Sequence, residues 1–431
     1  MQLYSTNNPT LRVDLKEAVM NSLPADKGLY MPLHIPRFES AFFHKLEDQS
    51  FQEIAFAIST ALIKDYIPAK VLSDIVEEAI NFPAPVQWLK EDLGVLELFH
   101  GPSLAFKDFG ARFMSRLMSF FNREEDRPLT ILVATSGDTG GAVAAGFYDT
   151  PGIEVIILYP SGKVSNLQEK QLTTLGKNIT ACEIEGTFDD CQSMVKKAFL
   201  DDDLKEKYRL SSANSINIAR LIPQSFYYFE AFKQIKKKND PIVISVPSGN
   251  FGNLTAGLMA KKMGLPIDTF IAATNINKIV PDYLKSGDYR PQSSIPTISN
   301  AMDVGNPSNF SRMMDLYGSM WEEVKKDIVG FFYDDNQTKE AIIEIDQKYG
   351  YTADPHGAIG YLALQAYQKN RSCTGIFLET AHPGKFLPTV EGVLGRKIEI
   401  PESLSSLADL EKSAHKMSKE YVDFKSFLLD R

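Results

Sequence analysis

Residues 99–114 read FHGPSLAFKDFGARFM and place a single lysine, Lys107, inside an apolar run. The apolar positions from Phe106 to Phe120 recur at helical spacing, which predicts a helix beginning near Phe106 with a buried stripe. Lys107 would then lie in the first turn, where the positive end of the helix dipole disfavours a cation and lowers the pKa of the ammonium group. A lysine that deprotonates easily is a nucleophile able to form a Schiff base, although a lysine at a random position is most often a surface charge.

Composition narrows the class of protein. The chain has 431 residues, a length that suggests two or three domains. Hydrophobic residues make up 44% of it, which is enough for a sizeable core. A net charge of -9 argues against a nucleic-acid-binding surface and against attraction to an anionic membrane. The N-terminus shows no signal-peptide pattern, and the three cysteines and six histidines show no metal-ligand spacing. We therefore expect a soluble cytoplasmic protein without a structural metal.

The chain shows two successive patterns of hydrophobic residues. Residues 51–67 and 68–82 have amphipathic helical patterns near the N-terminus. Beyond residue 93, short apolar, β-branched runs alternate with helical stretches, and the strand candidates are 130–134, 153–160, 178–185, 241–247, 268–275 and 374–380. Several of these runs are apolar throughout, as in strands buried on both faces. The pattern predicts an α/β fold with a mostly parallel sheet.

Three loops follow predicted strands, where ligands bind in such folds. They are ATSGDTGGAVAAG (134–146), VPSGNFGNLTAG (246–257) and ETAHPGKF (379–386). The second has a bare backbone at Gly249 and Gly252 and leads into a helix predicted to start near Asn253. Free N–H groups at a helix start form an anion site, commonly for phosphate. A glycine-rich turn alone is more often structural, but a second such loop and a poised lysine favour a functional site.

The phosphate prediction does not fit the two best-known nucleotide motifs. The loop 246–257 lacks the Gly-Lys-Ser/Thr ending of a P-loop. It also lacks the acidic residue that follows a dinucleotide-binding fingerprint at the end of the next strand. The loop is therefore neither a P-loop nor a dinucleotide-binding fingerprint.

Taken together, HGPSLAFKDFGARF (100–113), TSGDTG (135–140), SGNFGN (248–253) and ETAHPGKF (379–386) resemble threonine synthase. That family belongs to the fold type II, or β-family, enzymes that use pyridoxal 5′-phosphate, the fold of the tryptophan synthase β chain. The resemblance covers most of the chain and is closest to the longer bacterial and fungal form, which has an N-terminal helical extension. It implies segments 1–93 (helical extension), 94–235 (domain carrying the lysine) and 236–431 (domain carrying the phosphate loop).

The resemblance implies roles for individual residues. Lys107 matches the lysine that holds the cofactor, and Thr380 matches the residue facing its pyridine nitrogen. The residues matching the loop that binds the cofactor phosphate are Gly249, Asn250, Phe251, Gly252 and Asn253. The residues matching the loop that holds the substrate carboxylate are Ser136, Gly137, Asp138 and Thr139. Many members of the wider superfamily have Asn where this chain has Asp138, beside the ring hydroxyl of the cofactor.

The implied reaction converts O-phospho-L-homoserine and water into L-threonine and phosphate, the last step of threonine biosynthesis. A dianionic substrate phosphate needs cations or hydroxyl groups. Arg112 and Lys163 are candidates because each lies just past a motif loop, although a solvated helix face and a simple turn explain them about as well. Ser103, Asn306 and Arg312 are further possibilities.

Two other functions compete with this interpretation. A phospholyase or a threonine or serine dehydratase of the same fold would use the same lysine and phosphate loop but release ammonia. A non-catalytic protein that binds a phosphorylated metabolite would need only the glycine loops. The sequence does not choose between a monomer and a homodimer.

Overall fold

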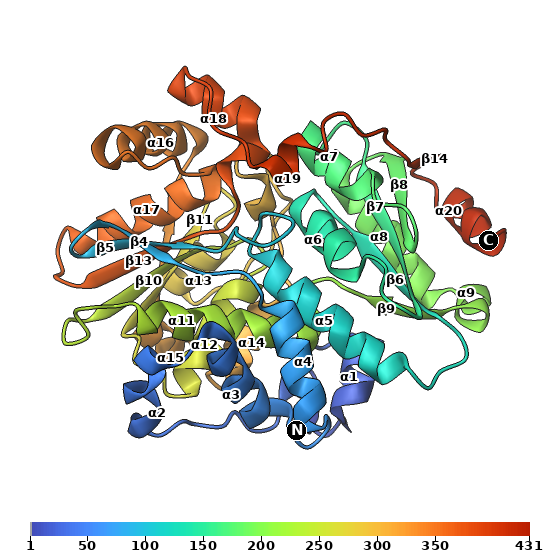
Figure 1. Cartoon of the computed structure of the whole chain (residues 1–431), viewed down its shortest axis with the longest axis horizontal. Helices are drawn as coiled ribbons and strands as arrows, with labels where there is room; N and C mark the ends of the chain where they lie inside the picture. Colours follow the sequence, from blue (N-terminus) through green and yellow to red (C-terminus); the bar gives the residue numbers. More distant parts are fainter. Residues whose placement is uncertain (1) are drawn as a thin grey trace.

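The computed structural model describes residues 2–431 and contains two largely parallel β-sheets, with the N-terminal helices below them in Figure 1. The six-stranded sheet has the order β12-β11-β10-β13-β5-β4. Its strands are β12 (Ile328–Phe332), β11 (Thr269–Thr274), β10 (Ile242–Pro247), β13 (Thr374–Glu379), β5 (Leu93–Glu97) and β4 (Val86–Lys90). Every neighbouring pair is parallel except β4 and β5.

The second sheet has five strands in the order β14-β8-β7-β6-β9, all parallel. They are β14 (His415–Ser418), β8 (Ile179–Glu185), β7 (Ile153–Pro160), β6 (Leu129–Ala134) and β9 (Arg209–Ser212). All six strands predicted from apolar runs are present within one residue at each end, because strands buried on both faces leave a continuous apolar signal. The α/β fold with mostly parallel sheets is confirmed.

Helices cover both sheets, as a parallel sheet requires. The helices that precede β10 in the sequence are α1 (Leu15–Asn21), α2 (Ser40–His44), α3 (Phe51–Ile63), α4 (Ala69–Ala79), α5 (Lys107–Asn122), α6 (Asp138–Phe147), α7 (Asn166–Thr173), α8 (Phe188–Leu200), α9 (Asp202–Lys207), α10 (Ile218–Leu221) and α11 (Phe226–Lys233). The later ones are α12 (Gly252–Lys262), α13 (Ile279–Ser286), α14 (Phe310–Asp315), α15 (Trp321–Asp327), α16 (Asp335–Tyr349), α17 (Pro355–Gln368), α18 (Leu387–Leu394), α19 (Glu402–Ser405) and α20 (Tyr421–Leu429). Short 3-10 turns are η1 (Leu46–Asp48), η2 (Ile222–Ser225), η3 (Asn300–Met302) and η4 (Pro383–Phe386).

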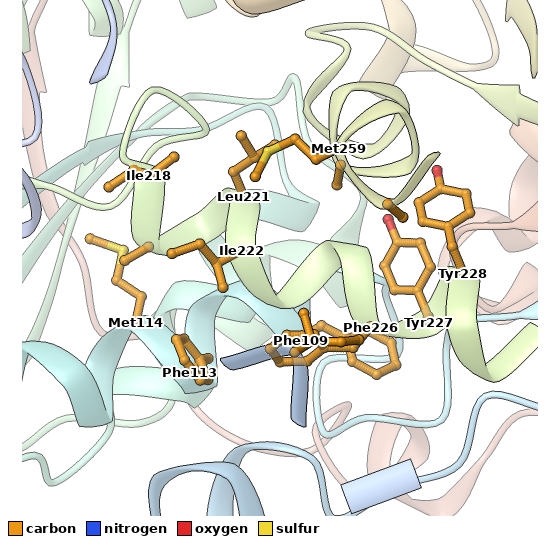
Figure 2. Packing of buried hydrophobic residues seen from close by; sticks show 14 of the residues in the cluster. Phe109, Phe113, Met114, Ile218, Leu221, Ile222, Phe226, Tyr227, Tyr228 and Met259 are labelled. Carbon is orange, nitrogen blue, oxygen red and sulfur yellow. The ribbon is translucent and has the colours of Figure 1, made fainter. Parts of the chain in front are cut away.

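The predicted helix near Phe106 is α5, and its apolar stripe is buried (Figure 2). The ring of Phe109 packs against Tyr227 at 5.4 Å between centroids, and that of Phe113 packs against Phe226 at 5.8 Å. Burying each phenylalanine contributes about 2 kcal/mol relative to leaving it exposed. Helix α5, which begins at Lys107, thus packs against α4, α6 and α10.

The N-terminal region is helical as expected, and it also contains a three-stranded antiparallel sheet of β2 (Arg12–Val13), β1 (Leu3–Ser5) and β3 (Tyr30–Pro32). The two large sheets are not continuous in sequence. Strand β5 pairs with β13 in the six-stranded sheet, and the C-terminal β14 pairs with β8 in the five-stranded sheet. The division of the chain into domains at residues 93 and 235 stays a prediction. Among residues 2–431, no helix combines the length and apolarity needed to cross a bilayer.

Candidate active site

One cavity of about 560 Å³ lies where the loops after β6, β10 and β13 meet, and its size suits a small organic ligand. These loops come from both sheets, at the carboxyl ends of their strands. Ten of the site residues predicted from the sequence line the cavity: Lys107, Ser136, Thr139, Lys163, Gly249, Asn250, Phe251, Gly252, Asn253 and Thr380.

Lys107 is the first residue of α5, and its ammonium group faces this cavity. Burial, opposed by the carboxylate of Asp138 and assisted by the cations of Arg220 and Lys385, lowers the pKa of Lys107 to about 8. The direction agrees with the expectation from the helix start, but removal from water is the largest cause. A substantial neutral fraction near pH 8 suits both a nucleophile and a proton carrier.

Residues 248–253, which we name the phosphate loop, connect β10 to α12. Within the described residues, the five backbone N–H groups from Gly249 to Asn253 have no hydrogen-bond partner. Unpaired donors at the start of an eleven-residue helix form an anion site. Their number and position fit a phosphate group.

The backbone of the phosphate loop is shaped by Phe251, whose φ is +60°. Gly252 itself has no positive φ, because it is the first residue of helix α12. An added Cβ at Gly252 would meet no atom closer than 3.5 Å, so the glycine leaves open space for a ligand. At Gly249 an added Cβ would lie 2.5 Å from the carbonyl oxygen of Ala301, so this glycine is needed for close packing.

The two asparagines of the phosphate loop hold its shape. The side-chain oxygen of Asn253 accepts from the hydroxyl of Ser248 at 2.9 Å, and its amide donates to the carbonyl of Pro247 at 2.8 Å. The side-chain oxygen of Asn250 accepts from the hydroxyl and the backbone N–H of Ser308. Since the side chains bind protein atoms, the backbone donors of the loop remain free for the ligand.

Residues 135–140, which we name the carboxylate loop, connect β6 to α6. The hydroxyl oxygen of Thr135 accepts from the N–H groups of Gly137 at 3.0 Å and Gly140 at 2.8 Å. These bonds leave the N–H groups of Ser136 and Thr139 without partners among the described residues. The loop can therefore receive a small anion such as a carboxylate.

Asp138 begins α6 beside the cavity and is almost completely buried. Its Oδ1 accepts from the ammonium group of Lys385 at 2.8 Å and from the side-chain amide of Gln168 at 2.9 Å. These cations and donors, together with Lys107, outweigh burial and hold the pKa of Asp138 well below its usual range. Asp138 is therefore a carboxylate with a fixed hydrogen-bonding pattern.

Thr380 follows β13 and lines the cavity. Its carbonyl oxygen accepts from the N–H of Phe106 at 2.9 Å, which ties the residue to the start of α5. Its hydroxyl group has no hydrogen-bond partner within residues 2–431. A free, uncharged hydroxyl at this position fits the nitrogen of a pyridine ring.

Arg112 is a correction to the sequence-based prediction. Its guanidinium donates to the carbonyl oxygens of Glu78 and Ala79 at the C-terminal end of α4, outside the cavity. The physical reason is helical periodicity, because five residues after Lys107 the side chain points about 140° away around α5. Arg312 likewise binds carbonyl oxygens, including that of Ile216 at 2.7 Å, and is fully buried.

Sequence reasoning did not single out Arg220 and Lys385. Arg220 lines the cavity, donates to the carbonyl of Ala213 at 2.9 Å, and has a buried Nε without a partner in residues 2–431. Together with Lys163, it is a cation available to a second anionic group of a ligand. Arg220 lies in the segment SINIARLIPQ (215–224), where a single cation among apolar residues was the available signal.

A third group that sequence reasoning missed lies behind Thr380. The ring Nδ1 of His356 lies 2.6 Å from a carboxylate oxygen of Asp354, whose other oxygen accepts from the N–H of Ala381. Glu379 accepts from the backbone N–H of Asp354, and burial together with the charge of Asp354 raises the pKa of Glu379 well above its usual range. Asp354 thus fixes both a cavity histidine and the backbone beside Thr380.

Comparisons with known proteins identify the family. The family model described as "Pyridoxal-phosphate dependent enzyme" matches residues 84–375, and models described as "Threonine synthase N terminus" and "Threonine synthase, C-terminal" match 2–80 and 357–428. The chain is 43% identical to threonine synthase of Escherichia coli over 100% of both chains, and 45% identical to that of Haemophilus influenzae over 100% of both.

Solved structures agree with the sequence comparisons. The crystal structure of Escherichia coli threonine synthase has a TM-score of 0.93 over 100% of both chains, at 43% identity. The yeast enzyme has a TM-score of 0.92 at 32% identity, covering 100% of this chain and 98% of that one. Maize serine racemase, at 16% identity and a TM-score of 0.55, covers 72% of this chain and 92% of that one and shares the fold alone. The chain therefore belongs to the threonine synthase family of pyridoxal-phosphate-dependent enzymes.

Proposed function

We propose that this protein is a threonine synthase that converts O-phospho-L-homoserine and water into L-threonine and inorganic phosphate. The observation that carries the proposal is the convergence of Lys107, the free N–H groups of residues 249–253 and the free hydroxyl of Thr380 on one cavity. Family membership over the whole chain supports the same activity. Cytoplasmic location and the choice between monomer and homodimer remain predictions from the sequence.

The residues of the cavity suit a cofactor with one phosphate group and one aromatic ring. The phosphate loop would bind the phosphate of pyridoxal 5′-phosphate, Lys107 would bind its aldehyde carbon, and Thr380 would face its ring nitrogen. When bound, the cofactor supplies an electron sink that makes the Cα proton of an amino acid acidic. Thr380 carries no charge and so does not hold a proton on the ring nitrogen.

The substrate carries two anionic groups, and the cavity offers separate donors for them. The N–H groups of Ser136 and Thr139 would hold the carboxylate, next to the phosphate loop. Lys163 and Arg220 would hold the substrate phosphate by charge-assisted hydrogen bonds. This division orients the carbon chain so that its Cα lies toward Lys107 and its Cγ toward the cations.

Lys107 is the group that moves protons in this arrangement. Its lowered pKa of about 8 makes the amine available to take the proton from Cα and return it further along the carbon chain. Removal of a proton from Cβ by the same amine then lets the Cγ–O bond break, and phosphate leaves with the bonding electrons. A proton adds at Cγ, the hydroxyl of water adds at Cβ, and Cα regains a proton. Arg220 and Lys163 would stabilise the negative charge of the departing phosphate.

A product assay tests the proposal. Purified protein loaded with pyridoxal 5′-phosphate is incubated with O-phospho-L-homoserine, and threonine, phosphate, ammonia and keto acid are measured together. We expect threonine and phosphate in equal amounts. Keto acid and ammonia without threonine would indicate a phospholyase. With L-threonine or L-serine as substrate, ammonia release would indicate a dehydratase. A colourless protein without turnover would indicate a binding protein.

A further inference from the structure

Lys385 is a second buried lysine at the active site that the proposed reaction does not use. Its side chain is fully buried in η4, after β13. Its ammonium group donates to Asp138 Oδ1 at 2.8 Å and to the carbonyl oxygen of Ser103 at 2.8 Å. A buried ammonium group is retained only where such partners compensate it.

The pair formed by Lys385 and Asp138 joins the two sheets of the molecule. Asp138 starts α6 after β6 of the five-stranded sheet, and Lys385 follows β13 of the six-stranded sheet. A second bond runs alongside, from the hydroxyl of Ser165 to the backbone oxygen of Lys385 at 3.2 Å. The carboxylate loop is therefore fastened to the segment that carries Thr380.

Three charged groups act on Lys107 from different elements: Asp138 on α6, Arg220 on α10 and Lys385 on η4. Asp108, the next residue on α5, directs a carboxylate oxygen to the N–H of Ser103 at 2.9 Å instead. Asp138 is thus the anion that favours a protonated Lys107, and Lys385 competes with Lys107 for that carboxylate.

We propose that Lys385 is a positioning residue that holds the Asp138 carboxylate across the two sheets and so keeps it from pairing with Lys107. The pair itself carries no net charge, and Lys107 stays free for covalent bonding to the cofactor and for proton transfer. The proposal rests on the assignment of Lys107 as the cofactor lysine in the proposed function.

The proposal gives opposite signs for the two single variants. In Lys385→Met the unpaired carboxylate turns toward Lys107, and the pH at which the visible absorption of the bound cofactor changes rises by about one unit or more. In Asp138→Asn the cation of Lys385 remains, and the same transition moves to lower pH. The double variant Lys385→Met/Asp138→Asn removes both charges, and its transition returns to within about half a unit of the parent.

The measurement is a spectroscopic pH titration of each holoenzyme, with the acid limb of the kcat profile as a second readout. Lys412→Met, which removes a lysine paired with Glu169 and Glu183 away from the cavity, is the matched control and leaves the transition unchanged. Should Lys385→Met not fold, Asp138→Asn and the double variant together decide the question, because the first must move the transition to lower pH and the second must return it toward the parent.

Shifts of the same sign in the two single variants, or no shift in either, would overturn the proposal. A double variant as far from the parent as Lys385→Met would do the same. The titration does not depend on which product the enzyme releases, so an enzyme that made keto acid would still test the pair. Absorption retained in Lys107→Ala would instead refute the assignment of Lys107.

Discussion

The two glycine-rich loops of the cavity differ in the donors and charges that they offer to an anion. The phosphate loop (248–253) has no charged side chain and presents five free backbone N–H groups. In the carboxylate loop (135–140), two N–H groups donate to the hydroxyl oxygen of Thr135. This loop also carries Asp138, whose charge is compensated by Lys385. The first loop therefore offers only neutral backbone donors, whereas the second offers fewer free donors beside a compensated charge.

This difference matches what each loop is proposed to bind. A cofactor phosphate stays in place through every turnover, so a rigid neutral cup is sufficient. The substrate enters and leaves beside Lys107, where the local charge decides how the lysine is protonated. Substitutions that affect one loop and spare the other can therefore separate cofactor binding from substrate binding.

The largest effect is expected at Lys107, which lines the same cavity as both loops. Lys107→Ala should fold, lose the visible absorption of bound cofactor and show no measurable turnover, while the free N–H groups of both loops remain. Absorption spectra, activity and circular dichroism on the same sample check this. If the variant keeps visible absorption that borohydride removes, another lysine near the cavity, Lys163 or Lys385, holds the cofactor.

A charge placed on the neutral side of the site should change the reaction itself. Thr380→Asp keeps the cofactor but holds a proton on its ring nitrogen, so threonine formation is lost and transamination rises relative to it. Threonine, keto acid and pyridoxamine phosphate are measured from one incubation. Thr380→Ser retains the hydroxyl and should keep threonine as the main product. An unchanged product ratio in Thr380→Asp would leave Thr380 as a strand-end residue without influence on the ring.

Filling the phosphate loop should weaken cofactor binding and leave the carboxylate loop intact. Gly252→Val places a side chain in the space beside the free N–H groups, and the affinity for pyridoxal 5′-phosphate falls on the order of 100-fold, or about 2.7 kcal/mol. Equilibrium binding after removal of the cofactor measures it. Gly392→Val makes the same change in helix α18, where an added Cβ meets nothing within 4 Å, and serves as the control. Equal affinity in both variants would place the phosphate elsewhere.

Loosening the carboxylate loop should raise KM and spare cofactor affinity. Thr135→Val removes the acceptor of two buried N–H groups, at a cost of about 1–3 kcal/mol, and we expect KM to rise about tenfold. The control is Thr130→Val in β6, because the hydroxyl of Thr130 is buried without a partner in the described chain. A fall in cofactor affinity matching that of Gly252→Val would show that the two loops do not act separately.

The sequence predicted the elements whose signal is local. Strands such as β7 and β10 are apolar runs, and both loops are marked by glycine after a strand. The pairing of β14 with β8 was not predictable, because more than two hundred residues separate the strands and β14 is short and largely exposed. Such pairings depend on packing that no short window of sequence contains.

The candidate site, like the fold, was predicted where the signal is local in the sequence. Motifs mark Lys107, Thr380 and the phosphate loop, and all of them line one cavity, while their roles remain proposals. Arg112 was misplaced because its position on the helix face was not considered. Lys385 was missed because a lysine after a glycine reads as a surface charge, and only the fold shows that Asp138 lies beside it.

The smallest expected effect concerns Glu379, the carboxyl group behind Thr380, and whether it is protonated in the folded protein. Glu379 lies directly before Thr380, is fully buried, and has one carboxylate oxygen without a partner in residues 2–431. Its pKa is raised well above 4.5, so the folded protein binds a proton here that the unfolded chain releases. This contribution to stability is complete below about pH 4.5 and is lost as the pH rises toward the folded pKa, by at most about 1.4 kcal/mol per pH unit.

Glu379→Gln cannot release the proton. Its free energy of unfolding should therefore rise steadily relative to that of the parent between pH 5 and 8, with activity at pH 7 within about twofold. Denaturant unfolding at several pH values measures the difference, and Glu340→Gln, an exposed glutamate of α16, gives the reference for the same change without burial. A difference that does not vary with pH would mean that Glu379 is ionised in the folded protein and that the neutral side of the site ends at Thr380.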